Sequence, residues 1–224
     1  LWVLKGINRA FATLLDKREI DPSLVPFLKG LVSTSLRVFL IIAVLGMLGI
    51  EMTSFIAILG AAGLAVGMAL SGTLSNFAGG VIILILKPFK VGDFIEAQGY
   101  SGTVHAIQIF YTILKTPDNK TIVIPNGPIS TGSLINYSTE PKRRVDWSVG
   151  IGYGDDVAEA RKILLDILEN DSRVLKEPAI FIKVEALADS SVNLATRVWV
   201  DAPDYWDVKM ETLEKIYNEF NAKG

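Results

Sequence analysis

Apolar and polar residues are distributed very unevenly along this chain. Two long apolar runs lie before residue 90, and shorter segments in which apolar and polar residues alternate follow it. The first run, within 22–50, is long enough to cross a membrane, for which about 20 apolar residues suffice in a helix. The second run, 53–86, has no charged residue. The pattern predicts a transmembrane region over 1–90 and a water-soluble part after it.

The second run is too long for one straight crossing. As a continuous helix, at about 1.5 Å per residue, it would extend about 51 Å, against a hydrocarbon core of about 30 Å. Kinks in helices gather at Gly/Ser pairs, so we expect a break near Gly72, with the remainder turned along the inner interface of the membrane. Residues 1–16 are too short to cross alone and are interpreted as the end of an earlier helix.

Small side chains recur every fourth residue in the first part of the second run. In a bilayer, helices associate through close backbone packing, and small residues at this spacing indicate a packing face. Two rows occur on different sides of the helix, so one helix can contact a neighbour on each side, as it would in a ring. The first row is Ala57, Ala61, Ala65 and Ala69, and the second is Gly63 and Gly67.

Two bulky residues, Leu64 and Met68, interrupt these rows and lie on one helix face. If several helices surround an axis with this face inward, the two side chains form stacked apolar collars, which block ions by dewetting. In the alternative interpretation they pack against the preceding helix, as most Leu and Met residues do. Periodicity leaves both interpretations open.

Basic residues indicate how the transmembrane region is oriented. Lys17 and Arg18 precede the helix predicted within 22–50, and Lys87 and Lys90 follow the helix predicted over 53–86. Basic residues favour the cytoplasmic side of a membrane, so we expect the C-terminal part to be cytoplasmic. Arg37 lies deep in the first apolar run, where a charge is costly. It either contacts lipid or serves a function, or it snorkels or is buried against a neighbour.

The soluble part divides into two predicted domains. Residues 91–139 contain about five period-two segments separated by turn signals, which is typical of a small all-β barrel or sandwich. Residues 140–224 follow the order β-α-β-β-α, which is most of an α+β ferredoxin-like domain. Its final strand is expected beyond Gly224.

The candidate chemistry is sparse. The chain has no Cys and one His, His105, so it offers no thiolate nucleophile and no multi-His metal site. Asp156 and Glu159 are interpreted as a helix capping box rather than a phosphate-binding loop. The basic cluster within 140–146 lies in an acidic half of the chain, which favours a solvated or inter-subunit face over nucleic acid. We therefore expect no enzyme activity, no cofactor and no metal.

Several spaced motifs carry a family resemblance. They are "GAAGLAVGMALSGTLSNFAGGV", "KPFKVGDFI", "GTVHAIQIFYT", "IVIPNG" and "LINYS". In these, the chain closely resembles the bacterial mechanosensitive channel of small conductance family. The resemblance implies a homoheptamer in the bacterial inner membrane, with three transmembrane helices per subunit and the third lining the pore. It also implies a cytoplasmic vestibule made of an Sm-like β barrel and a ferredoxin-like domain.

The resemblance also implies a function and residue roles. Membrane tension would open the channel and release ions and small solutes during hypo-osmotic shock, with membrane lipids as further partners. A ligand-modulated channel of the same fold, with the cytoplasmic domain as sensor, is the alternative. The roles implied are a pore gate at Leu64 and Met68, hinges at Gly72 and Gly80, and a bridge from Asp21 to Lys87 and Lys90.

Overall fold

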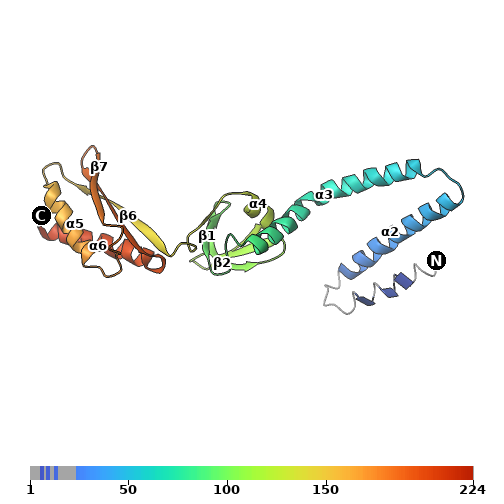
Figure 1. The fold of residues 1–224 in the computed structure, drawn as a ribbon, viewed down its shortest axis with the longest axis horizontal. Coiled ribbons are helices and arrows are strands. Elements are labelled where there is room, and N and C mark those ends of the chain that lie inside the picture. Colours follow the sequence, from blue (N-terminus) through green and yellow to red (C-terminus); the bar gives the residue numbers. More distant parts are fainter. Residues whose placement is uncertain (1–5, 8, 11–12, 15–23, 224) are drawn as a thin grey trace. The chain divides into compact units, whose positions relative to one another are not determined.

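The computed structural model describes residues 6–7, 9–10, 13–14 and 24–223 (Figure 1). The described residues before 24 are helical, and Asp21, one end of the predicted bridge, lies outside the described residues. The chain divides into two compact units, Leu1–Ser71 and Gly72–Gly224.

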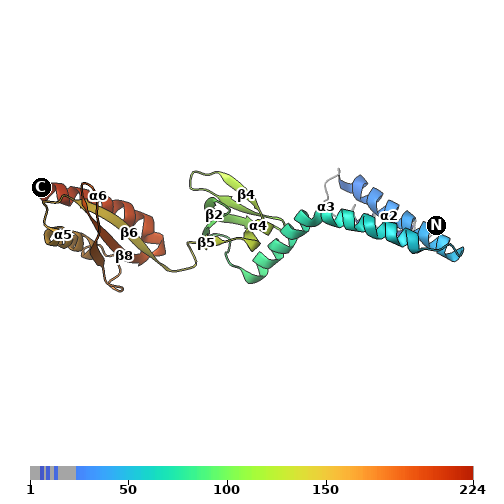
Figure 2. The ribbon, with the colours of Figure 1, turned by 90° about the horizontal axis from the view of Figure 1, so that it is seen from above.

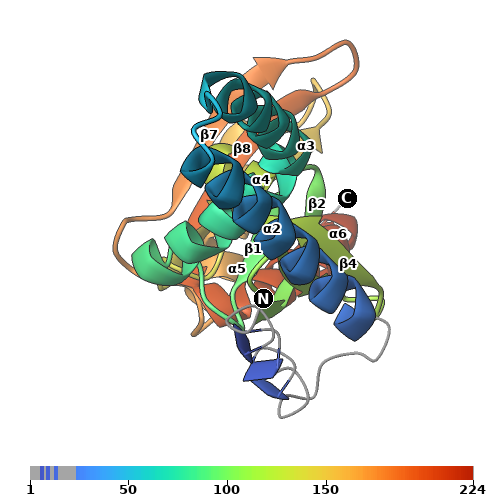
Figure 3. The same cartoon turned by 90° about the vertical axis from the view of Figure 1, so that its right-hand side faces the viewer.

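Two long apolar helices come first in the described chain. Helix α2 spans Leu24–Met47 and α3 spans Thr53–Leu86; Figure 3 views the chain from the side of these helices. In each, the most apolar stretch of 18 residues has a mean hydropathy of 2.0, and each helix is long enough to cross a membrane. After α2 ends, Gly49 adopts a φ of +80°, which glycine tolerates because it has no Cβ. The chain then turns into α3.

Helix α3 is hydrogen-bonded as a helix throughout and is not interrupted at Gly72. A glycine within a helix costs about 1 kcal/mol relative to Ala but does not by itself end the helix. The boundary between the two compact units nevertheless falls between Ser71 and Gly72. A hinge at Gly72 remains a prediction.

The second unit begins with the end of α3 and continues into an antiparallel β domain. Its five strands are hydrogen-bonded in the order β4-β3-β2-β1-β5. A short helix, α4, connects β4 to β5. The bounds are β1 Phe94–Ala97, β2 Tyr100–Ile107, β3 Tyr111–Lys115, β4 Thr121–Pro125, α4 Asn126–Thr131 and β5 Leu134–Asn136.

The prediction of a closed, Sm-like barrel is wrong, because this sheet is open. Strands β4 and β5 are at its two edges and, within the described residues, do not pair with each other. Side chains from outside the strands complete the core instead. Three such side chains are almost fully buried in it: Ile83 of α3, Phe89 from the segment between α3 and β1, and Ile129 of α4. Since these residues cover the apolar core, the sheet does not need to close on itself.

The C-terminal domain has the predicted β-α-β-β-α order. Its antiparallel sheet has the strand order β6-β8-β7, and Figure 2 shows its two helices, α5 and α6, beside it. The bounds are β6 Lys142–Ile151, α5 Val157–Glu169, β7 Phe181–Leu187, β8 Val192–Asp201, the 3-10 turn Ala202–Asp204 and α6 Tyr205–Lys223.

Both helices pack on one face of this sheet. Alternate residues of β6 are buried, and they join Leu164 of α5 and Val208 of α6 in a single core. Burying a Leu or Val side chain contributes about 1.5–3 kcal/mol. Helix α5 begins at the predicted cap, where the Asp156 carboxylate accepts a hydrogen bond of 2.7 Å from the Ala158 amide.

Candidate functional site

The first part of α3 makes little contact with the rest of its own chain. Leu64 and Met68, which share a helix face at i and i+4, are 65% and 64% exposed. Apart from the nearby backbone of α3 itself, a Cβ placed on Gly63 or Gly67 would meet no atom of the described residues within 4 Å. The bulky pair and the glycine row are therefore both available to other molecules.

The geometry of a helix places these features in a definite order around α3. With about 3.6 residues per turn, the alanine row drifts around the helix: Ala57 falls within the Leu64 and Met68 face, and Ala65 and Ala69 lie on one flank of it. Gly63 and Gly67 lie on the other flank. A helix with this arrangement can contact one neighbour on each flank while the bulky face points between them.

The last turns of α3 belong to the β domain, and α4 lies beside them (Figures 1 and 2). The backbone amide of Gly127 in α4 donates a hydrogen bond of 2.9 Å to Oδ1 of Asn76 in α3. The rings of Phe77 and Phe110 pack with their centroids 6.2 Å apart. This part of α3 is thus fixed to the domain that follows it.

Asn126, the first residue of α4, organises this contact. It is fully buried, as is Thr112, whose hydroxyl donates a hydrogen bond of 2.8 Å to Asn126 Oδ1. Asn126 Nδ2 donates to the carbonyl oxygens of Gln108 at 2.8 Å and Ile109 at 3.1 Å. Each buried polar atom of this amide therefore has a partner, which avoids a desolvation cost of about 1–3 kcal/mol.

The residue types at 125–127, Pro-Asn-Gly, favour a turn, and no local pattern in the sequence gives Asn76 or Asn126 a role. The structure shows instead that α4 starts at Asn126. The start of α4 could have been recognised from an Asn that directly follows a proline at the end of an apolar strand. Asn is a common N-terminal residue of helices, but its partners here come from β3 and the loop before it.

Gly79 and Gly80 allow α3 to approach the β domain closely. A Cβ on Gly80 would clash with the carbonyl oxygen of Ile109 and would lie 2.7 Å from Asn126 Nδ2. A Cβ on Gly79 would lie 2.6 Å from the Asn126 carbonyl oxygen. Both distances are shorter than van der Waals contact, so glycine is required here for packing. A hinge role for Gly80 remains a prediction.

The other predicted membrane-side residues within the described chain are exposed. Lys87, directly after α3, has a φ of 49°, and the Lys90 amide donates a hydrogen bond of 2.9 Å to Asp93 Oδ2. Both lysine side chains are exposed, as is Arg37 on α2. The bridge to Asp21 and the lipid contact of Arg37 remain predictions.

The basic cluster in 140–146 makes contacts within its own chain. The guanidinium of Arg143 lies 3.6 Å from the centre of the Tyr205 ring and 5.0 Å from that of Tyr137. Arg144 donates to Asp146 at 2.8 Å. Cation–π and ion-pair contacts of this kind account for the two arginines.

A second charged network ties the segment after α5 to α6. The Asp171 carboxylate is almost fully buried and accepts a hydrogen bond of 2.7 Å from Arg173. Lys215 of α6 lies 3.4 Å from the same carboxylate, and Arg173 also pairs with Glu211 at 2.7 Å. The hydrogen bond from Arg173 holds the pKa of Asp171 well below its usual range. The network anchors α6 at its middle.

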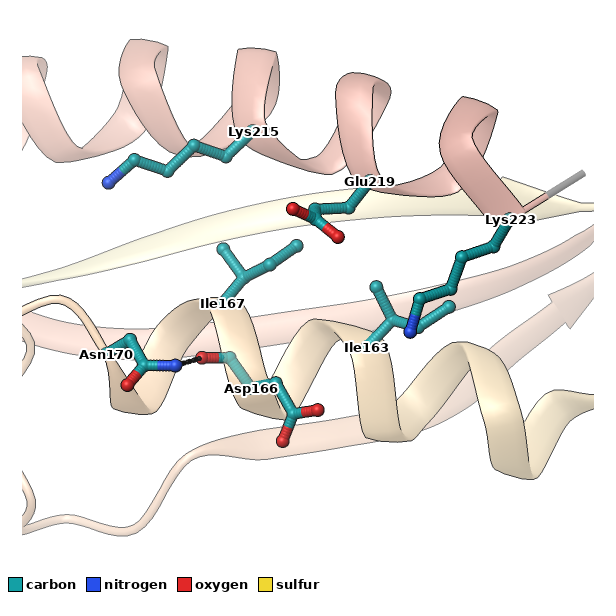
Figure 4. A pocket seen from close by; sticks show the side chains of 7 residues that line it. All are labelled: Ile163, Asp166, Ile167, Asn170, Lys215, Glu219 and Lys223. Atoms are coloured by element: carbon teal, nitrogen blue, oxygen red, sulfur yellow. Dashed lines mark hydrogen bonds between the residues drawn. The ribbon is translucent and has the colours of Figure 1, made fainter.

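The described part of the chain gathers no reactive set of side chains. His105 is exposed on β2, and no three His, Asp or Glu residues among those described could hold a metal ion together. A recess of about 360 Å³ lies between α5 and α6, and Figure 4 shows the side chains that line it. Its side chains include Ile163, Lys215 and Glu219, which is the composition of a solvated seam between helices.

Almost the whole described chain matches known protein families. Residues 32–71 match the family of transmembrane helices 2 and 3 of mechanosensitive ion channels. Residues 72–139 match the mechanosensitive ion channel β-domain family, and residues 145–224 match the C-terminal domain of the mechanosensitive ion channel MscS. The first boundary coincides with the one between the two compact units.

Individual relatives agree with this assignment. The chain is 43% identical over 222 residues to the small-conductance mechanosensitive channel of Edwardsiella ictaluri, covering 99% of this chain and 78% of that one. It is 35% identical to the small-conductance mechanosensitive channel of Helicobacter pylori, covering 96% of this chain and 78% of that one.

A solved structure shares the fold over nearly the whole chain. The crystal structure of Helicobacter pylori MscS in the closed state superposes with a TM-score of 0.92 at 33% identity, covering 99% of this chain and 87% of that one. Three family matches, relatives at this identity and a common fold lead to one conclusion. The chain belongs to the MscS family of mechanosensitive ion channels.

Proposed function

We propose that this chain assembles as a homoheptamer in the bacterial inner membrane, with its C-terminal domains in the cytoplasm. Membrane tension opens the channel, which releases ions and small solutes during hypo-osmotic shock. Rings of Leu64 and Met68 form the closed gate. Homo-oligomers are the rule in this family, and a gate made from one helix per subunit requires them.

The observation that carries this proposal is the order of residues around α3. The exposed Leu64 and Met68 face has Ala65 and Ala69 on one flank and Gly63 and Gly67 on the other, and the two glycines have open space around them among the described residues. Small residues let neighbouring helices approach closely. Copies of α3 packed through their flanks would direct the bulky face toward a common axis.

Gating then follows from the work that tension does on the membrane. Tension favours the conformation with the larger area in the membrane plane and so shifts a two-state population toward it. The helices before α3 move outward with the lipid and turn α3, which withdraws Leu64 and Met68 and lets water fill the constriction. Because Asn76 fixes the end of α3 to the β domain, bending concentrates near Gly72.

Polar residues at the membrane surface would support this movement. Asp21 pairs with Lys87 or Lys90 and couples the preceding helices to the end of α3, at a gain of at most about 1 kcal/mol at an exposed site. Arg37 contacts the phosphate groups of lipids, because an unpaired charge within the hydrocarbon is costly. These contacts adjust the tension threshold rather than form the gate.

The gate is tested by replacing Met68 with Ser and recording from patches under controlled suction. The hydroxyl weakens the apolar barrier, so Met68→Ser should open at a lower tension than the unmodified channel. Met47→Ser makes the same change at the end of α2, outside the proposed gate, and should leave the threshold unchanged. An unaltered threshold in Met68→Ser would show that this residue is not in the gate.

A further inference from the structure

Helix α6 has two apolar faces, and only one of them is covered. Val208 and Ile216 point into the core of the C-terminal domain and are buried. A second row is exposed, with between 54% and 69% of each residue accessible to solvent. We call this row the α6 stripe: Trp206, Met210, Leu213 and Tyr217.

The spacing of the α6 stripe is that of a contact surface. Its residues are four, three and four positions apart, which places them within a narrow arc of the helix. Four large apolar side chains in one row form a continuous exposed patch, and patches of this kind mark interaction sites. Asp207 and Glu214 lie along one side of the stripe, so its rim there is acidic, and on the other side the Lys209 ammonium lies 5.5 Å from the centre of the Trp206 ring.

A second apolar patch lies on β7, at the edge of the same sheet. Val184 and Leu187 pair with Leu194 and Val192 of β8 and so point to the face on which the helices pack. They remain exposed, Leu187 to 71%. Phe181 on the other face of β7 is also exposed. We call Phe181, Val184 and Leu187 the β7 edge.

Two cations lie beside Phe181, at one end of the β7 edge, and one of them, Arg197, also lies 3.8 Å from the Glu185 carboxylate. The Lys183 ammonium lies 5.5 Å from the centre of the Phe181 ring, and the Arg197 guanidinium lies 5.2 Å from it. The acidic side of the α6 stripe and the two cations beside Phe181 are complementary in charge. Such complementarity favours one partner and one register over others.

We propose that the α6 stripe of one subunit packs against the β7 edge of the adjacent subunit. The occupant of each patch is a second copy of this chain. A ring requires two different surfaces on every subunit, because a surface that contacts itself gives only pairs. The C-terminal domain carries two such apolar patches on different elements. This inference rests on the oligomer in the proposed function and assigns an interface to it.

The absence of cysteine from the chain allows a direct test. The double variant Met210→Cys with Leu187→Cys is expressed in membranes and oxidised, and the products are separated under non-reducing conditions. We expect a ladder of covalent dimers, trimers and larger species. Met210→Cys alone should stay monomeric on the gel. The control pair Asn218→Cys with Leu187→Cys moves the thiol off the stripe and should give no ladder.

The same membranes are treated with an amine-reactive cross-linker, which detects oligomers whatever their interface. Amine-linked oligomers without a disulfide ladder would overturn this interface and leave the proposed function standing. Dimers from Met210→Cys alone would overturn it as well, because the α6 stripes would then face each other. If neither reagent yields oligomers, both the interface and the proposed ring are wrong.

Discussion

At the scale of single residues, the clearest electrostatic feature is the Asp171 carboxylate. It is almost fully buried and is satisfied by Arg173 and Lys215. A buried charge is tolerated only when paired and hydrogen-bonded. Since the Arg173 hydrogen bond lowers the pKa of Asp171 in the folded state, the pair contributes to stability in a pH-dependent way.

We predict that Asp171→Asn destabilises the channel by about 1–3 kcal/mol at pH 7, the usual cost of disrupting a buried charged hydrogen bond. Because the folded-state pKa lies below that of the unfolded chain, the stabilisation is complete above about pH 4. It is lost as the pH falls toward the folded-state pKa. Thermal unfolding in detergent at pH 7 and at lower pH measures both effects.

Asp146→Asn is the matched control, because Asp146 also pairs with an arginine, Arg144, but is about half exposed. Exposed pairs contribute roughly 0–1 kcal/mol, so its effect should be small. A deficit for Asp171→Asn that is no larger than that of Asp146→Asn would refute the anchoring role. The anchoring role would also be refuted if the loss of stability in Asp171→Asn, relative to the unmodified chain, stays constant as the pH is lowered below about 4.

At the scale of elements, α3 has two parts with different surroundings. The part before Gly72 has no buried residue, whereas Gly79, Gly80 and Ile83 are buried in the second unit. One continuous helix therefore ends in a fixed attachment to the β domain. The attachment depends on the absence of side chains at two glycines as much as on the Asn76 hydrogen bond.

We predict that Gly80→Ala loosens this attachment. The added methyl group would clash with the Ile109 carbonyl oxygen, and such overpacking costs roughly 1–3 kcal/mol. Amide hydrogen exchange over 126–131 should become faster, because the Gly127 amide loses its partner Asn76. Gly30→Ala, on α2 with nothing within 4 Å of an added Cβ, should leave this exchange unchanged. Unaltered exchange in Gly80→Ala would contradict the account.

The elements with local signals were predictable from the sequence. The uncharged run gave α3 its bounds, the order of periodic segments gave the C-terminal domain its strands and helices, and Asp156 gave the start of α5. The Asn76 to Gly127 contact joins residues 51 positions apart, and no local pattern encodes such a pairing. The open β sheet was missed for the same reason, since Ile83 and Phe89 complete its core from outside the strands.

At the scale of the whole molecule, two features bear on function: the family to which the chain belongs and the order of residues around α3. The family assignment makes the chain a mechanosensitive channel, and the order of residues around α3 supports a gate at Leu64 and Met68. In the proposed interface, the α6 stripe and the β7 edge supply the contacts between C-terminal domains of adjacent subunits. In the proposed mechanism, such a channel opens without a ligand.

The most direct test of that claim is recording from purified protein in a bilayer of plain lipid, with suction as the only stimulus. We expect no current at rest and a current that appears as tension rises. The tension at which it appears should be lower for Met68→Ser than for the unmodified channel. Stretch-activated current should persist without any added cytoplasmic solute. No current under tension up to rupture of the patch, or current only after a cytoplasmic ligand is added, would contradict it.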